Sequence, residues 1–221
     1  MDLRVVLVEP ENPLNVGFVA RAMRAFGVEE LVVVSSPLTS MPAEAHVTGV
    51  CAPGILGGAR FVKDLGAALR GCETAIAFSR RPTELRQEEF TLPNIPADLS
   101  LKGRVALVFG RESTGLTRAE TAQCPRLARI PSQNGVSLNL GQAVAVGLFS
   151  LTAKDGEHTE KAPTASLDRM LALWDYVHPK LAASPRLTEA RLRRVRQMFY
   201  RMKLNDNDFD MLFSVMKALA R

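Results

Sequence analysis

The spacing of hydrophobic positions predicts alternating strands and helices over most of the chain. Residues 3–9 (LRVVLVE) and 31–35 (LVVVS) are continuous runs rich in β-branched residues, which is typical of strands buried on both faces of a parallel sheet. Between the two runs, hydrophobic residues recur at helical spacing at Val16, Val19, Met23 and Phe26. Gly27 follows at the place where a left-handed C-cap would end the helix. This segment therefore predicts a β-α-β unit.

Further apolar runs extend this alternation. Three more strands are predicted, at residues 74–78, 104–110 and 126–131. Helical segments are predicted near 42–50, near 64–70 after the capping residue Asp64, and at 138–151. Alternation of this kind predicts an α/β fold with a mostly parallel sheet and helices on both faces.

The last third of the chain has a different pattern. Residues 152–166 (TAKDGEHTEKAPTAS) lack periodicity and mix charge with Gly, Pro, Ser and Thr, as linkers do. Helices are predicted beyond them, around 167–178, from the N-cap candidate Thr188 through Lys203, and at 207–220. We therefore expect three parts: a sheet domain over 1–153, a linker over 154–166 and a small C-terminal helical domain over 167–221.

Composition narrows the class of protein. With 221 residues, 47% of them hydrophobic, the chain can bury a full core. No window approaches the ~18 apolar residues of a membrane span, and the N-terminus lacks a basic-then-apolar signal. We expect a cytoplasmic protein with no membrane association. Cys51, Cys72 and Cys124, like the three histidines, lack metal-ligand spacing, which favours reduced thiols and no metal.

Positive charge is concentrated in the C-terminal part of the chain. The net charge is +5, and residues 186–203 (RLTEARLRRVRQMFYRMK) contain seven Arg or Lys residues and one Glu. A basic stretch on a folded helix attracts a polyanion. A solvated helix face whose long side chains cover apolar surface explains the same pattern, and the charge alone leaves both interpretations open.

Candidate chemistry lies after the strands, since ligands of open parallel sheets bind beyond their carboxyl ends. Three stretches with polar residues and glycines are placed there: EPENPLNVGFVARAMRAFG, FGRESTGL and IPSQNGVSLNLGQA. The common nucleotide motifs are absent, because no GxGxxG follows a strand and no GxxxxGK[ST] occurs. These absences disfavour a dinucleotide dehydrogenase, a P-loop NTPase and a Rossmann-type methyltransferase.

These three stretches resemble the ordered motifs of the SpoU-type RNA ribose methyltransferases of the SPOUT superfamily. NVGFVARAMRAFG resembles the first motif, FGRESTGL the second and IP…SLNLGQA the third. The basic tail is similar to the helical extension of the tRNA (cytidine/uridine) 2′-O-methyltransferases that modify position 32, the first nucleotide of the anticodon loop. The resemblance implies a deep C-terminal trefoil knot, S-adenosylmethionine as cofactor, RNA as partner and a homodimer whose site draws on both subunits.

The resemblance also implies a set of catalytic residues: Arg21, Asn15, Glu112, Ser137 and Asn139. Arg21 would activate the ribose 2′-hydroxyl electrostatically, because an arginine is too basic to abstract the proton. Asn15 would cap the first helix and orient Arg21, and Glu112 would position Arg21 or the substrate. Helix capping explains one of Ser137 and Asn139, but not comfortably both.

Further residues carry over by motif position. The implied cofactor contacts are Phe78, Ser79, Arg80, Gly110, Ile130, Val136, Ser137 and Leu138. Gly110 has the clearest physical reason, since a missing Cβ permits close approach of another group to the backbone. The expected RNA contacts are Arg80, Arg81, Arg86, Arg191, Arg193, Arg194 and Arg196. Two positions depart from the motifs: Phe18 stands where a smaller residue is commoner, and Gly141 stands where alanine is commoner.

The function expected from these motifs is S-adenosylmethionine-dependent 2′-O-methylation of tRNA in the anticodon loop. Two alternatives remain open at this point. One is a ribosomal RNA 2′-O-methyltransferase, and the other is a catalytically silent RNA-binding dimer of the same fold. A third possibility, another nucleotide-dependent enzyme, would need a conventional phosphate loop, and the sequence has none.

Overall fold

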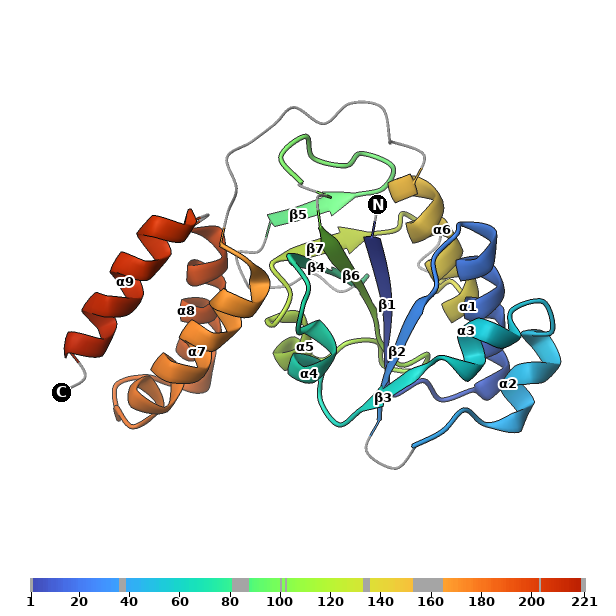
Figure 1. Ribbon diagram of the computed structural model, residues 1–221, viewed down its shortest axis with the longest axis horizontal. Coiled ribbons are helices and arrows are strands. Elements are labelled where there is room, and N and C mark those ends of the chain that lie inside the picture. The colour runs from blue at the N-terminus through green and yellow to red at the C-terminus, as the bar shows by residue number, and fades with distance from the viewer. Residues whose placement is uncertain are drawn as a thin grey trace.

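A computed structural model describes residues 2–35, 39–80, 88–99, 101, 103–132, 136–152, 165–202 and 204–219. Its centre is a seven-stranded parallel sheet in the order β3-β2-β1-β6-β4-β7-β5. The strands are β1 (Asp2–Val8), β2 (Glu30–Val34), β3 (Arg60–Val62), β4 (Thr74–Phe78), β5 (Glu88–Thr91), β6 (Arg104–Phe109) and β7 (Arg126–Arg129). Figure 1 shows β1 and β6 in the middle of this sheet.

Helices cover both faces of the sheet, as predicted (Figure 1). One face packs against α1 (Pro13–Ala25), α2 (Ala43–Thr48), α3 (Pro53–Gly57) and α6 (Leu140–Thr152). On the other side lie α4 (Leu65–Leu69), α5 (Arg118–Thr121) and the C-terminal helices α7 (Leu167–Ala182), α8 (Glu189–Arg201) and α9 (Asp206–Leu219). The central strands are buried on both faces, which explains their uninterrupted apolar sequences.

Local capping signals fix where several helices begin. The side chain of Asp64 accepts a hydrogen bond from Ala67 N at the start of α4, and Thr188 caps α8 in the same way. Gly27 follows α1 with a φ of +69°, in the left-handed region that glycine adopts without strain. These boundaries agree with the sequence analysis because they depend on contacts within a few residues.

The C-terminal helices have their own apolar cluster, but they also pack against the sheet domain. Leu167 and Leu171 of α7 join the core on the α4 side of the sheet. The Asp168 carboxylate accepts a hydrogen bond from Gly71 N at 2.7 Å, and buried Gln197 of α8 donates to Ala122 O. The division at 153 and 167 stays a prediction, since 153–164, most of the expected linker, lie outside the described residues.

Four elements were not predicted from the sequence. They are the short strands β3 and β5 and the one-turn helices α3 and α5. β3 spans three residues and β5 four, too few to display a period, and each lies at an edge of the sheet where one neighbour is enough. Tertiary pairing rather than local pattern therefore decides that these segments become strands.

Candidate active site

The loops after β1 and β6 are joined at the carboxyl edge of the sheet. The Glu112 carboxylate, in the loop after β6, accepts hydrogen bonds from the backbone N–H groups of Glu11 (2.8 Å) and Asn12 (3.3 Å). Glu112 Oε1 also accepts one from Asn15 Nδ2 at 3.0 Å. One carboxylate thus binds three donors of the β1–α1 segment, and charge-assisted bonds of this kind fix the two loops relative to each other.

The segment before α6 joins the same network. Asn139 Nδ2 donates to Asn15 Oδ1 at 2.7 Å, and Asn139 Oδ1 accepts from Gly141 N at 2.9 Å, which caps the start of α6. The expectation that Asn15 caps α1 is wrong, because the N-cap is Asn12. Asn15 is instead buried in the first turn of α1, where it connects Glu112 to Asn139.

A second pair of hydrogen bonds connects the first two loops in the opposite direction. Glu11 Oε2 accepts from Ser113 N at 2.9 Å, and Glu11 Oε1 accepts from the Ser113 hydroxyl. These bonds, the hydroxyl bond first, lower the pKa of the Glu11 carboxyl and favour its ionised form. Each loop therefore presents a carboxylate to the backbone of the other.

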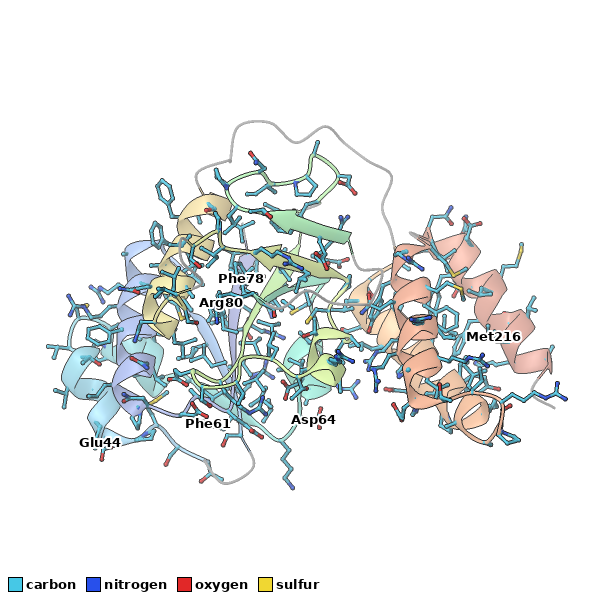
Figure 2. The ribbon with its side chains drawn as sticks, turned by 180° about the vertical axis from the view of Figure 1, so that it is seen from behind. Glu44, Phe61, Asp64, Phe78, Arg80 and Met216 are labelled. Atoms are coloured by element: carbon cyan, nitrogen blue, oxygen red, sulfur yellow. The ribbon has the colours of Figure 1, made fainter. Side chains whose placement is uncertain are left out.

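An open cavity lies beside this network, lined from the ends of β4, β6 and β7 and the start of α6. Its volume, including the open mouth, is about 870 Å³. Its lining contains Glu112 and most of the expected cofactor residues, namely Phe78, Ser79, Arg80, Gly110, Ile130, Ser137 and Leu138. Figure 2 shows Phe78 and Arg80 close together in this region. Residues that follow β4, β6 and β7 thus share one site, and the stretch after β1 adjoins it through Glu112.

The Phe78 ring belongs to the core more than to the cavity. It stacks on Phe109 with ring centroids 4.4 Å apart and planes 18° apart, and its side chain is almost fully buried. A Cβ at Gly147 of α6 would lie 2.9 Å from this ring, so the missing side chain makes room for it. Phe78 can therefore offer a ligand its backbone and little of its ring.

Gly110 is required by its own loop. A Cβ at this position would lie 2.3 Å from the backbone of Gly115 and Leu116, which folds back over Gly110. The sequence analysis attributed the missing side chain to close approach of a ligand, and the structure shows another backbone segment there instead. A substitution at Gly110 would displace this loop before any ligand is considered.

The side chains around the cavity fit the cofactor that the resemblance implies. Ile130, Leu138, Leu140 and Ala143 provide an apolar wall suited to an adenine ring. Ser79, Ser132 and Ser137 supply hydroxyl groups for a ribose or a carboxylate, and Glu112 supplies negative charge at the edge. This combination of a flat apolar wall, hydroxyls and a carboxylate suits S-adenosylmethionine.

Four of the expected catalytic and cofactor residues lie outside the cavity lining, namely Asn15, Asn139, Arg21 and Val136. Asn15 and Asn139 belong to the network beside the cavity. Arg21 is exposed on α1, and within the described part of the chain the structure records no hydrogen bond or ion pair for it. Val136, expected to contact the cofactor, is 64% exposed and does not line the cavity either. The single chain therefore assembles the network around Glu112 but does not place the Arg21 guanidinium in the same cavity.

The arginines that were expected to contact RNA have different surroundings in the structure. Arg81 and Arg86 lie outside the described residues, as do Gln133 and Asn134 of the third motif. Arg193 forms an ion pair with Glu189 at 3.3 Å on α8. The Arg196 guanidinium lies 5.3 Å over the Trp174 ring, on the inner side of the same helix.

The outer side of α8 carries an exposed basic stripe. Arg191 and Arg194 point to solvent there, next to Met198, Arg201 and Met202, which share the same face. Arg201 was not among the expected contacts, although its helical spacing from Arg194 placed it on this face. We call these five residues the α8 stripe.

Several lining residues were missed by the sequence analysis. Ser113 and Thr114 directly follow Glu112 in the second motif, so their proximity to the site was readable from the sequence. Ala143 lies one helical turn beyond Asn139, and helical spacing from the third motif pointed to it. Ser132 lies two residues after Ile130 in the third stretch, so its proximity to the site was also readable from the sequence.

The described residues contain neither a group of metal ligands nor a membrane-spanning helix. Among the described residues, no three His, Cys, Asp or Glu side chains are grouped as metal ligands would be. Within the same residues, every helix is too short or too polar to cross a bilayer.

The chain was then compared with known proteins. A sequence profile described as the SpoU rRNA Methylase family matches residues 2–149. The tRNA (cytidine/uridine-2′-O-)-methyltransferase TrmJ of Escherichia coli K12 is 28% identical over 238 residues, covering 99% of this chain and 95% of that protein.

Solved structures give the same result. The crystal structure of TrmJ from Zymomonas mobilis ZM4 (Z. mobilis) superposes over 100% of both chains with a TM-score of 0.87 at 23% identity, which shows a shared fold. An AdoMet-bound rRNA methyltransferase from Sinorhizobium meliloti has a TM-score of 0.54 at 21% identity, over 71% of this chain and 57% of that one.

These findings confirm the expected α/β fold and the expected class of RNA methyltransferase. The trefoil knot stays a prediction. The profile covers well over half of the sequence and includes all three loops that meet at the cavity. The chain therefore belongs to the SpoU rRNA Methylase family.

Proposed function

We propose that this protein methylates the ribose 2′-oxygen of a nucleotide in the anticodon loop of tRNA. The observation that carries the proposal is the cavity lined by the second and third sequence motifs, beside the Asn15–Glu112–Asn139 network that joins the first motif to both. The full-length similarity to a tRNA (cytidine/uridine) 2′-O-methyltransferase favours tRNA as the substrate and cytidine or uridine as the nucleotide. We place this activity in the cytoplasm.

S-adenosylmethionine, when bound, supplies a methyl group on a positively charged sulfur that an oxygen nucleophile can displace. The chain's contribution is to hold the two reactants in line, and such positioning accounts for ~7–11 kcal/mol in well-oriented reactions. The apolar wall formed by Ile130, Leu138 and Leu140 would hold the adenine. The Ser137 hydroxyl is placed to donate to, or accept from, a polar group of the cofactor or the ribose.

Arg21 would activate the ribose hydroxyl from a second subunit. Its guanidinium lies on the exposed face of α1 rather than in the cavity of its own chain. A cation beside the 2′-hydroxyl favours loss of its proton and stabilises the resulting oxyanion. A site that combines the cavity of one protomer with Arg21 of its partner explains why one chain does not bring the two together.

The surface around Arg21 suits such an interface. Leu14 and Phe18 of α1 are 39% and 43% exposed, and Phe149 of the adjacent α6 is 62% exposed. Phe26 packs edge-on against Phe149, which continues the apolar surface along the two helices. An exposed apolar surface of this kind marks a contact site, and a second copy of the chain is the occupant that supplies Arg21.

The helical C-terminal domain would bind the RNA backbone. In the α8 stripe, Arg191, Arg194 and Arg201 present positive charge to solvent without covering a core. Contacts between such cations and phosphates release counterions, so RNA affinity should fall steeply with salt. Arg80 at the cavity mouth would add a contact near the reacting nucleotide.

The proposal is tested by incubating the protein with unmodified total tRNA and labelled S-adenosylmethionine, followed by nuclease mapping of the methylated ribose. Label on a 2′-oxygen of an anticodon-loop pyrimidine is the expected result. Label found only when ribosomal RNA is supplied would move the substrate to that RNA. Binding of tRNA without transfer to any RNA would overturn the enzymatic function and favour a silent RNA-binding dimer.

A further inference from the structure

Arg111, next to Glu112, has the most connected charged side chain near the site. Arg111 Nε donates to Glu9 Oε2 at 2.7 Å, and its two terminal nitrogens donate to the Glu120 carboxylate at 3.1 and 3.0 Å. Nη1 also lies 3.4 Å from Gly115 O in its own loop. The Arg111 and Glu120 side chains are only 17% and 16% exposed, so the contact between them is shielded from water, whereas Glu9 is 52% exposed. Arg111 lies within the second motif, but no role was expected for it from the sequence.

The two partners of Arg111 come from different parts of the fold. Glu9 ends β1 with a φ of +46°, a left-handed conformation that non-glycine residues rarely adopt. Glu120 belongs to α5, where it forms a capping box with Thr117. Arg111 therefore ties the end of β1 and the start of α5 to the loop after β6.

The charge states of Arg111 and Glu120 favour a lasting contact between them. Hydrogen bonding to Glu120, and then to Glu9, raises the pKa of the Arg111 guanidinium above its ordinary value. Burial alone would raise the pKa of Glu120, but hydrogen bonds from Arg111 and Thr117 outweigh it and lower the pKa overall. The Arg111 guanidinium and the Glu120 carboxylate are therefore both charged near neutral pH.

The fold contains an equivalent ion pair that lies away from the site. β1 and β6 pair in parallel register, and an Arg–acid pair joins them at each end: Arg104 with Asp2 at the amino end, and Arg111 with Glu9 at the carboxyl end. Both pairs have the same sequence offset, 102 residues. Only the pair at the carboxyl end adjoins the cavity and Glu112.

We propose that Arg111 is a positioning residue for methyl transfer, which holds the Glu112 carboxylate, and through it Asn15 and Asn139, in the arrangement that the reaction needs. The proposal rests on the proposed function. Without the guanidinium, two carboxylates face each other across the loop, and Glu9 loses the contact that keeps its unusual backbone conformation. The loop after β6 can then shift, and Glu112 shifts with it. Arg104 joins the same two strands, but it lies at their amino ends, away from the site.

The test compares Arg111→Met with Arg104→Met. We expect Arg111→Met to lower kcat by roughly tenfold to hundredfold with KM for tRNA little changed, because misplacement affects the reacting geometry more than binding. Arg104→Met should keep kcat while its urea midpoint falls at least as much. Arg111→Lys should be intermediate, since an ammonium cannot bridge both carboxylates. Equal kcat in the two methionine variants at equal loss of stability would overturn the proposal.

A double-substitution cycle separates positioning from general destabilisation. If Arg111 acts through Glu112, the double variant Arg111→Met, Glu112→Gln should be no slower than Glu112→Gln alone. If the two substitutions instead lower kcat by the product of their separate factors, Arg111 acts independently of Glu112, which would contradict the proposal. If Arg111→Met does not fold, Glu9→Gln removes only the exposed partner and should lower kcat in the same way.

A readout without turnover separates failure of this inference from failure of the proposed function. The amide protons of Glu11 and Asn12 donate to Glu112, so hydrogen exchange at these two sites reports its position directly. Arg111→Met should accelerate exchange there and Arg104→Met should not. If the wild-type protein transfers no methyl group but exchange responds as expected, the positioning role stands and the proposed function fails. Unchanged exchange in Arg111→Met would overturn the positioning role whatever the activity.

Discussion

At the scale of single residues, the polar side chains at the site are occupied with one another. Glu112 accepts from three donors of the β1–α1 segment, and Asn139 both caps α6 and binds Asn15. The exception is Arg21, whose side chain is exposed. A cation with no recorded partner among the described residues of its own chain suits a role toward RNA in a neighbouring subunit, and this separates Arg21 from the residues that hold the loops.

Substitution of Arg21 should therefore affect chemistry without affecting the cofactor. Arg21→Ala is expected to abolish detectable methyl transfer while calorimetry still detects S-adenosylmethionine binding, because the guanidinium does not line the cavity. Arg24→Ala, one exposed position further along the same helix, is the matched control and should retain activity. Retained turnover in Arg21→Ala would remove this residue from the mechanism.

Cys72 gives a prediction for stability at high pH. Burial raises the pKa of its thiol to about 11 from an ordinary value of 9.0, because the core disfavours the thiolate. Because the pKa is raised in the folded state, the stability that the neutral Cys72 thiol contributes is complete below pH 9. It is lost as the pH rises to about 11. The wild type should lose about 2 kcal/mol more than Cys72→Ala across this window. Urea unfolding of both proteins at pH 8.5 and 11 measures the difference, and parallel pH dependence would contradict it.

At the scale of elements, α1 and α6 pack closely because Gly141 has no side chain. A Cβ at Gly141 would lie 2.7 Å from the Cβ of Phe18, so this contact depends on the missing Cβ in α6 and not on the ring of Phe18. Neither residue could be paired with the other from the sequence, since they are separated by most of the sheet.

This contact is testable by stability measurements. Gly141→Ala should destabilise the protein by about 1–3 kcal/mol, because the added methyl group overlaps Phe18. Replacing Phe18 by glycine in the same protein should recover part of the loss, because the overlap is with the Phe18 Cβ, which alanine would retain. Gly54→Ala in α3 is the control, since a Cβ there meets nothing within 4 Å. If the effects of the two substitutions on the free energy of unfolding simply add, residues 18 and 141 do not interact.

The α8 stripe gives a second prediction at this scale. The double variant Arg191→Gln, Arg194→Gln should weaken tRNA binding and reduce the slope of log K against log salt by about 2, one for each lost phosphate contact. Arg60→Gln, at the edge strand β3, should leave the slope unchanged. Filter binding across a salt series measures both. An unchanged slope in the double variant would return the stripe to the role of a solvated helix face.

At the scale of the whole molecule, the C-terminal helices are not an independent appendage. Leu167 and Leu171 complete the core behind β1 and β6, so deleting the tail would expose an apolar face of the sheet. In the view of Figure 2, Met216 of α9 lies far from Phe78 and Arg80 at the cavity. The proposed RNA-binding surface of the tail therefore lies at a distance from the cavity, and substitutions test its role better than truncation does.

The surface proposed for dimer formation lies on α1 and α6, on the opposite side of the molecule from the C-terminal helices. Phe149→Glu places a charge in the exposed apolar surface of α1 and α6 and should convert a dimer to a folded monomer that lacks methyl transfer. Met211→Glu on α9 is the control, since it places the same charge at an equally exposed apolar position outside this surface. Analytical ultracentrifugation measures both. A monomeric wild type, or a Phe149→Glu variant that remains a dimer, would contradict the interface.

The central strands and most helix boundaries were predictable because each depends on a local signal. β4 spans 74–78 as predicted, and Asp64 and Thr188 cap the helices that they were expected to cap. The site residues were accessible by motif, and most of them meet at one cavity. What failed were roles that depend on a partner in space. Asn15 is a link in a network rather than a cap, and Gly110 makes room for its own loop rather than for a ligand.

By itself, the amino-acid sequence determined the alternation of strands and helices, the basic C-terminal part and the three motifs, because hydrophobic period, charge and motif spacing are properties of neighbouring residues. Only the tertiary structure decided that Arg111 binds Glu9 and Glu120, that Phe18 faces Gly141, and that Arg21 lies outside the cavity. These contacts arise when strands distant in the sequence pair in a fixed register. Register depends on the packing of the whole sheet, which no local pattern contains.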